Sequence, residues 1–129
     1  MWIAAIKQAT VQAWIPDYIA TGLRADGLLV LKKDNMLVPY FVEAQRVVNA
    51  SPFDKVEKYT ALFESKSWCK EWWVQKTEDG RPRFPAVLIL TDGGQLHKRR
   101  LEAAIADQNH RGLRFVVITL EELLEGGWC

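Results

Sequence analysis

The segments LRADGLLVLKK (residues 23–33) and MLVPYFVEAQR (residues 36–46) decide the fold. Each is a largely apolar run of strand length, and only Asp34 and Asn35 separate the two. These two residue types tolerate the left-handed backbone that a tight turn requires. The pattern therefore predicts an antiparallel β-hairpin.

One helix is expected before this hairpin in the sequence and another after it. Residues 2–14 carry apolar side chains at helical spacing, and Pro16 would end that helix. After the hairpin, Ser51 and Pro52 are helix-start signals, so a second helix is expected over about residues 53–65. Its core face would carry Phe53, Val56, Thr60 and Phe63, with Lys55, Tyr59 and Leu62 in a neighbouring stripe.

The C-terminal half is predicted to contain a third helical stretch over about residues 67–75 and then a βαβ unit. Residues 86–91 and 114–119 are continuous apolar runs typical of buried strands. A helix between them, ending at Gly112, would form a right-handed crossover. The apolar positions of this helix are Leu96, Leu101, Ala104 and Ile105.

A last helix is expected to begin at Thr119, with Glu122 placed for a capping box, and to stop at Gly126. The expected order is α-β-β-α-α-β-α-β-α, with a mixed central sheet of about four strands and flanking helices. A chain of 129 residues has the size of one ordinary domain. We therefore expect a single α/β domain over residues 1–129.

The composition is that of a globular protein, with 49% apolar and 26% charged residues. The net charge of +1 argues neither for nor against a nucleic-acid partner. Cys69 and Cys129 lack the spacing of zinc ligands. No apolar run is long enough for a membrane span and no signal peptide is evident, so a cytoplasmic location is expected.

Two carboxylates are predicted to meet at the end of the hairpin. The period of two places Phe41, Glu43 and Gln45 on one face of the second strand. A turn at Asp34 brings the Asp26 end of the first strand close to Glu43. Neighbouring carboxylates repel one another, and a hard cation such as Mg²⁺ relieves that repulsion. Such a site can activate water for phosphodiester hydrolysis.

Two segments and a following helix carry a family resemblance. The segments are Arg-Ala-Asp-Gly-Leu (residues 24–28) and Phe-Val-Glu-Ala-Gln-Arg (residues 41–46), and the helix supplies Lys55, Lys58 and Tyr59. Together they resemble the PD-(D/E)xK nuclease superfamily. More narrowly, they are similar to the replication-relaxation proteins of bacterial plasmids and mobile elements.

The resemblance implies a restriction-endonuclease-like core and a metal-dependent deoxyribonuclease that uses Mg²⁺ or Mn²⁺. Asp26 and Glu43 would be the metal ligands, and the carbonyl of Ala44 or the side chain of Gln45 would complete the shell. The family's lysine normally stands where this chain has Gln45, so Lys55 would supply the positive charge. Ala25 occupies the place of the family's proline.

A literal Pro-Asp pair also occurs earlier in the sequence, at Pro16 and Asp17. Asp17 is expected in a turn that ends the first helix. We therefore assign the site to Asp26 rather than to Asp17.

The resemblance also implies that DNA is the partner, with a set of basic and aromatic contacts. Family members usually carry an N-terminal winged-helix region, which this sequence lacks, so a truncated or a stand-alone version is expected. The expected DNA contacts are Arg46, Lys58, Tyr59, Lys98, Arg99 and Arg100.

Other interpretations remain open for the same residues. Glu43 could instead pair with Lys32 or Arg46, and the basic cluster at residues 97–100 could be a solvated face. A nuclease fold without activity would bind DNA or a replication partner. A third interpretation is a protein-interaction domain that uses exposed tryptophans and forms a homodimer. Trp68 and Trp72 are expected in the core, whereas Trp73 is left open.

Overall fold

The computed structural model describes residues 10–46 and 53–124, which form an α/β structure around a mixed five-stranded sheet. The strand order is β1-β2-β3-β6-β7. Pairing is antiparallel from β1 to β3 and parallel from β3 to β7. The strands are β1 (Thr10–Ala20), β2 (Leu23–Lys33), β3 (Met36–Gln45), β6 (Ala86–Thr91) and β7 (Phe115–Thr119).

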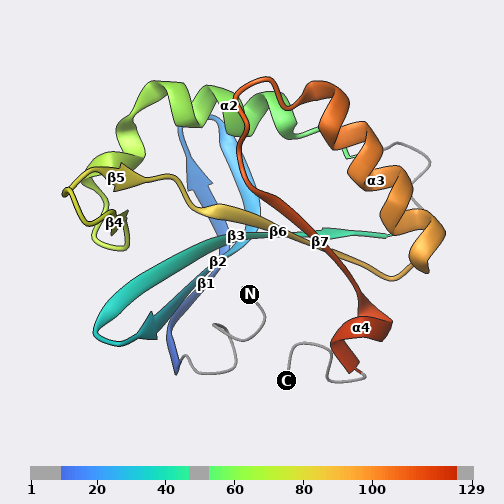
Figure 1. Cartoon of the computed structure of the whole chain (residues 1–129), viewed down its shortest axis with the longest axis horizontal. Helices are drawn as coiled ribbons and strands as arrows, with labels where there is room; N and C mark the ends of the chain where they lie inside the picture. The colour runs from blue at the N-terminus through green and yellow to red at the C-terminus, as the bar shows by residue number, and fades with distance from the viewer. Residues whose placement is uncertain (1–9, 47–52, 125–129) are drawn as a thin grey trace.

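Two helices cover one face of this sheet, α2 (Val56–Ser65) and α3 (Gln95–Gln108) (Figure 1). The short helix α4 (Leu120–Leu124) follows β7 and lies on the other side of the sheet in the same view. A 3₁₀ turn, η1 (Ser67–Lys70), leads into the small hairpin of β4 (Gln75–Lys76) and β5 (Pro82–Arg83). Among the described residues, no helix is long and apolar enough to cross a membrane.

The hairpin predicted from residues 23–46 is confirmed. Lys33 pairs with Met36, and the two residues between them, Asp34 and Asn35, have φ angles of 50° and 63°. Both angles lie in the left-handed region, which suits the twist of the paired strands. The parallel pairing of β6 and β7 around α3 is confirmed as well.

The helix predicted over residues 2–14 is wrong for its described part, because residues 10–20 form strand β1. Residues 2–9 lie outside the described part of the chain. Among the described strands, β1 lies at the edge of the sheet and pairs with β2 alone, so Pro16 does not break the sheet although it lacks a backbone donor. Asp17, expected in a turn, lies within β1 with a φ angle of 50° and pairs with exposed Arg24 at 3.1 Å.

The core lies between the sheet and α2. The face of α2 that packs against this core differs from the predicted one. The buried residues of α2 are Val56, Tyr59 and Leu62, whereas the predicted core residues Thr60 and Phe63 are only partly buried. The hydrophobic stripe is therefore rotated by about one position. The helix-start signals Ser51 and Pro52 lie outside the described residues.

Aromatic rings fill the centre of this core. Phe41 contacts the rings of Tyr18, Tyr59, Trp73 and Phe84, with centroids 5.4–6.2 Å apart. Trp73 is buried, and its indole N–H donates to the Tyr18 hydroxyl at 3.1 Å.

Four further predictions are corrected. Trp72, expected in the core, is 56% exposed, whereas Trp68 is buried as predicted. The helix expected over residues 67–75 is only the 3₁₀ turn η1. On α3, Leu101 and Ile105 are buried as predicted, but Leu96 is exposed. The sheet also has five strands rather than about four.

The capping box before α4 is confirmed. The Thr119 N–H donates to Glu122 Oε1 at 3.1 Å, and the Glu122 N–H donates to Thr119 Oγ1 at 3.0 Å. These reciprocal bonds satisfy two backbone donors at the start of the helix. The predicted helix end at Gly126 lies outside the described residues.

Candidate active site

Asp26 and Glu43 come together at the end of the hairpin that lies away from its turn. The ladder of β2 and β3 runs as far as the pair Gly27 and Val42, and Asp26 and Glu43 are the next residues on each strand. The backbone N–H of Ala44 donates to Asp26 Oδ2 at 2.7 Å, which ties the two strand ends together. The pairing of the strands therefore brings both predicted carboxylates to one place.

The Glu43 carboxylate is buried, with 2% of the residue exposed, and both of its oxygens are bonded. Lys55 Nζ donates to Oε1 at 2.9 Å, and the Tyr59 hydroxyl donates to Oε2. Lys55 Nζ also donates to the carbonyl oxygen of Arg24 at 2.8 Å. The ion-pair partner of Glu43 is thus Lys55, and neither Lys32 nor Arg46 takes that place.

The face of β3 that carries Glu43 is covered by the rest of the protein at Phe41 and Glu43. Phe41, two residues earlier on the same face, is fully buried in the aromatic core. Helix α2 covers this face (Figure 1). Lys55 immediately precedes α2, and Tyr59 lies one turn later, with its backbone N–H bonded to the Lys55 carbonyl at 3.0 Å. The spacing of four residues therefore places both donors over one carboxylate.

Burial is the largest cause of the shifted pKa values of Glu43 and Tyr59. Burial raises the pKa of Glu43 above its usual range, and the charge of Asp26 adds to this. The hydrogen bonds from Tyr59 and Lys55, together with the positive charge of Lys55, oppose the rise. Burial, followed by the negative charge of Glu43, raises the pKa of the Tyr59 hydroxyl. Tyr59 therefore remains a hydrogen-bond donor at ordinary pH.

The side chains available to a metal ion at this site are the two carboxylates Asp26 and Glu43. No group of three or more His, Cys, Asp or Glu side chains gathers anywhere in residues 10–46 and 53–124. Mg²⁺ needs no such group, because it is commonly bound through one or two carboxylates, with waters and substrate phosphates completing its shell. Asp26 is exposed, and a carboxylate oxygen can accept more than one bond. Asp26 and Glu43 could therefore share an ion.

Residues at the carboxyl ends of the neighbouring strands extend the site. Gln45 pairs with Thr91 across β3 and β6, and Arg46 lies 3.7 Å from Asp92. The carboxyl ends of parallel strands are where ligands bind in open α/β sheets.

A threonine–histidine contact at the end of β6 escaped the sequence reasoning. The buried Thr91 hydroxyl contacts His97 Nδ1 in the first turn of α3 and accepts the Gly93 N–H at 3.1 Å. A Cβ at Gly93 would lie 2.6–2.8 Å from atoms of His97, so this close approach requires glycine. The glycine pair before the helix was a signal that could have indicated it.

The predicted DNA contacts are not all on the surface. Tyr59 is fully buried, so its side chain is not placed for direct contact with DNA in this structure. Lys98 is partly buried and bonds Glu122 at 3.0 Å, whereas Arg99 and Arg100 are exposed on α3. Lys58 is exposed on α2. Lys58, Arg99 and Arg100 therefore have exposed side chains without an ion-pair partner among residues 10–46 and 53–124.

The fold and this site define an α/β protein with a mixed five-stranded sheet and a buried carboxylate held by a lysine and a tyrosine. Comparison of the chain with protein-family models, with curated proteins and with solved structures gave no match.

Proposed function

We propose that the protein is a DNA-acting nuclease of the PD-(D/E)xK type, similar to the replication-relaxation proteins, that hydrolyses a phosphodiester with Mg²⁺ or Mn²⁺. The observation that carries the proposal is the convergence of Asp26, Glu43 and Lys55 at one end of the hairpin. Lys55 Nζ is 2.9 Å from Glu43, and Asp26 is bonded to the residue after Glu43. Two carboxylates can hold a divalent ion, and a nearby cation can stabilise the charge that develops on the attacked phosphate.

Each side chain of the cluster has a distinct task in this proposal. When bound, the divalent ion supplies Lewis-acid chemistry that activates water and polarises the phosphate. Asp26, which is exposed, and Glu43, which is buried, would hold that ion. Lys55 supplies the positive charge next to the reacting phosphate, since Gln45 cannot act as a cation. Tyr59 holds the Glu43 carboxylate in one orientation.

The test is metal-dependent nicking of supercoiled plasmid. Asp26→Asn, Glu43→Gln and Lys55→Gln are each expected to lower the cleavage rate at least tenfold, because each removes charge from the reacting centre. Glu57→Gln is the matched control, since Glu57 is an exposed carboxylate on α2. Cleavage that survives the first two substitutions unchanged would remove the pair from catalysis.

Gln45 favours a second candidate function, an inactive nuclease fold that binds DNA. Its exposed basic residues Arg99 and Arg100 would then contact phosphates, and affinity would fall steeply with salt. Fluorescence anisotropy with duplex DNA tests this in the absence of metal. Arg99→Gln with Arg100→Gln is expected to weaken binding and to flatten its salt dependence. Tight binding that is unaffected by salt and by the two arginine substitutions would rule out this second function.

A further inference from the structure

Three polar side chains gather at the other end of the parallel strands, two of them on the face away from α2. Phe41, Phe84 and Phe115 all pack in or against the core on the α2 side. Successive side chains of an extended chain point to opposite faces. Tyr40 and Arg114 immediately precede Phe41 and Phe115 and therefore project to the opposite side of the sheet. Arg83, at the end of β5, immediately precedes Phe84, and its charge acts on both Tyr40 and Arg114.

Pairing and hydrogen bonds hold these three residues near one another. Tyr40 pairs with Ala86 at the start of β6, and the Val87 N–H donates to the Arg114 carbonyl at 2.8 Å. The Arg114 guanidinium donates through Nη2 to the carbonyl oxygen of Phe84 at 2.6 Å, directly beside Arg83. That bond fixes Arg114 and leaves its other donors available.

The presence or absence of a carboxylate partner distinguishes these two arginines from their neighbour Arg81. In the part of the chain that the structure describes, neither Arg83 nor Arg114 forms an ion pair with a carboxylate, whereas nearby Arg81 pairs with Asp79 at 3.2 Å. Burial and then repulsion from Arg83 lower the pKa of Arg114. Burial raises the pKa of Tyr40, and the charges of both arginines oppose that rise. Two like charges flank one phenol.

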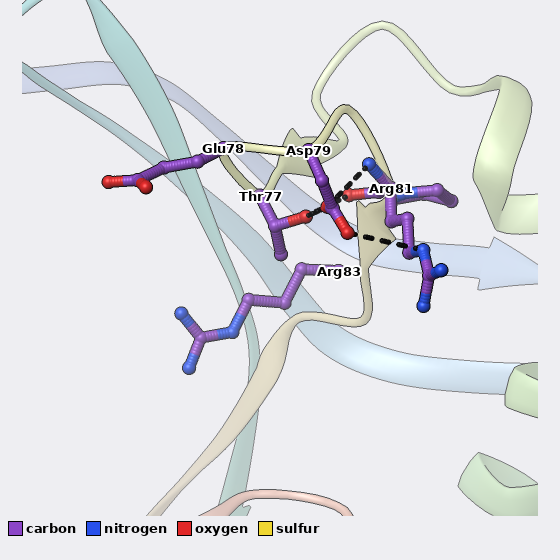
Figure 2. Close-up of a pocket in the computed structure, with 6 residues that line it drawn as sticks. Thr77, Glu78, Asp79, Arg81 and Arg83 are labelled. Carbon is purple, nitrogen blue, oxygen red and sulfur yellow. Dashed lines mark hydrogen bonds and ion pairs between the residues drawn. The ribbon is translucent and has the colours of Figure 1, made fainter.

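A surface depression of about 680 Å³ adjoins Arg83 (Figure 2). Residues of the β4–β5 turn line it, and the Arg83 side chain extends away from the Asp79–Arg81 pair. Neither Arg114 nor Tyr40 lines this depression, so it marks the open surface beside Arg83 and is not itself the proposed site. Its lining residues are Thr77, Glu78, Asp79, Arg81, Pro82 and Arg83.

We propose that Arg83, Arg114 and the Tyr40 hydroxyl form a phosphate-binding site separate from Asp26 and Glu43. Guanidinium groups present planar sets of donors that match phosphate oxygens, and a phenol adds one more donor. A bound phosphate would also remove the repulsion between the two arginines. The site lies on the opposite face of the sheet from Glu43, so it goes beyond the proposed nuclease activity and does not depend on it.

Side-chain NMR of the whole chain tests the site directly. Inorganic phosphate is titrated against chloride at equal ionic strength, and the Nε–Hε signals of the arginines are followed. Saturable shifts are expected for Arg83 and Arg114 but not for Arg81. Arg83→Gln should weaken phosphate binding about tenfold, the effect of losing one charge-assisted hydrogen bond. Arg81→Gln is the matched control, and Tyr40→Phe keeps the ring while removing the donor.

A second arm separates a free phosphate from a nucleic-acid phosphate. Short single-stranded oligonucleotides with and without a 5′-phosphate replace the inorganic ion. Saturable, Arg83-dependent shifts with any of these probes support the site and show which phosphate it takes. The proposal is overturned if no probe saturates, or if binding is unchanged in Arg83→Gln. Because Arg83→Gln leaves the bond from Arg114 to Phe84 in place, loss of fold does not confuse the result.

Discussion

The ammonium group of Lys55 lies 2.9 Å from the Glu43 carboxylate, joining the residue before α2 to strand β3. The Lys55 side chain is 27% exposed and that of Glu43 only 3%. When one member of an ion pair is buried, removing the other member leaves an uncompensated charge away from water, which destabilises the fold. The cluster is therefore a tertiary link between helix and sheet as well as a candidate active site.

Lys55→Met is expected to destabilise the protein by about 2–3 kcal/mol, because the buried Glu43 charge loses its ion-pair partner. The loss is measured as the free energy of unfolding in urea. Lys58→Met is the control, since Lys58 is exposed on the same helix and should change stability by less than about 0.5 kcal/mol. Equal effects of the two substitutions would contradict a structural role for the ion pair.

Tyr59→Phe is expected to cost about 1.5–3 kcal/mol, the range for a hydrogen bond to a charged group. The ring remains to pack against Phe41 and Phe115, so the cost isolates the lost hydroxyl. A double-mutant cycle with Glu43→Gln gives the measurement, because the two sites share one bond. Strictly additive effects of the two substitutions would show that the hydroxyl and the carboxylate do not interact.

The capping box at α4 should make part of the stability depend on pH. Burial tends to raise the pKa of Glu122, but hydrogen bonds from Thr119 and Lys98 outweigh it and the pKa is lowered. A carboxyl whose pKa is lower in the folded state stabilises the fold when the pH is above its pKa in the unfolded state. That stabilisation is lost as the pH falls through its pKa in the folded state.

The free energy of unfolding of the wild-type protein should therefore exceed that of Glu122→Gln by about 1 kcal/mol at pH 7. This difference should shrink below about pH 4.5, the ordinary value for glutamate. Urea unfolding of both proteins across that range gives the measurement. A gap that stays constant with pH would mean that the charge of Glu122 contributes nothing.

Gly27→Ala is expected to destabilise the sheet by about 1–2 kcal/mol, because an added Cβ would overlap the indole of Trp14. Trp14 is half exposed, so its ring can move away at a limited cost. Thermal unfolding of Gly27→Ala in the wild-type and Trp14→Ala backgrounds isolates this contact. The substitution should cost less when the indole is absent, and an equal cost in both backgrounds would place its cause in the backbone.

Several features followed from local sequence signals. Asp34 and Asn35 lie in the left-handed turn that their residue types favour, and Thr119 and Glu122 form the predicted capping box. Strand β1 was missed because Ala13 and Trp14 also fit a helical period. Pairing with β2 overrides that weak local preference, and an edge strand can accept Pro16.

The site shows the same division between local and tertiary information. Alternation along β3 and the turn position were enough to bring Asp26 and Glu43 to one end of the hairpin. They were not enough to show that Glu43 is buried or that Tyr59 lies in the core. Two adjacent stripes of α2 had similar apolar content, and the rotation of the helix against the sheet decided which stripe was covered.

The sequence by itself determined the central hairpin, the strand–helix–strand unit of β6, α3 and β7, and the end at which the two carboxylates meet. These features depend on turn residues, apolar runs and caps, which act over a few neighbouring positions. Only the tertiary structure decided that residues 10–20 form a strand and that Lys55 and Tyr59 enclose Glu43. Those outcomes depend on pairing and packing between segments far apart in the chain, whose free energies exceed local propensities.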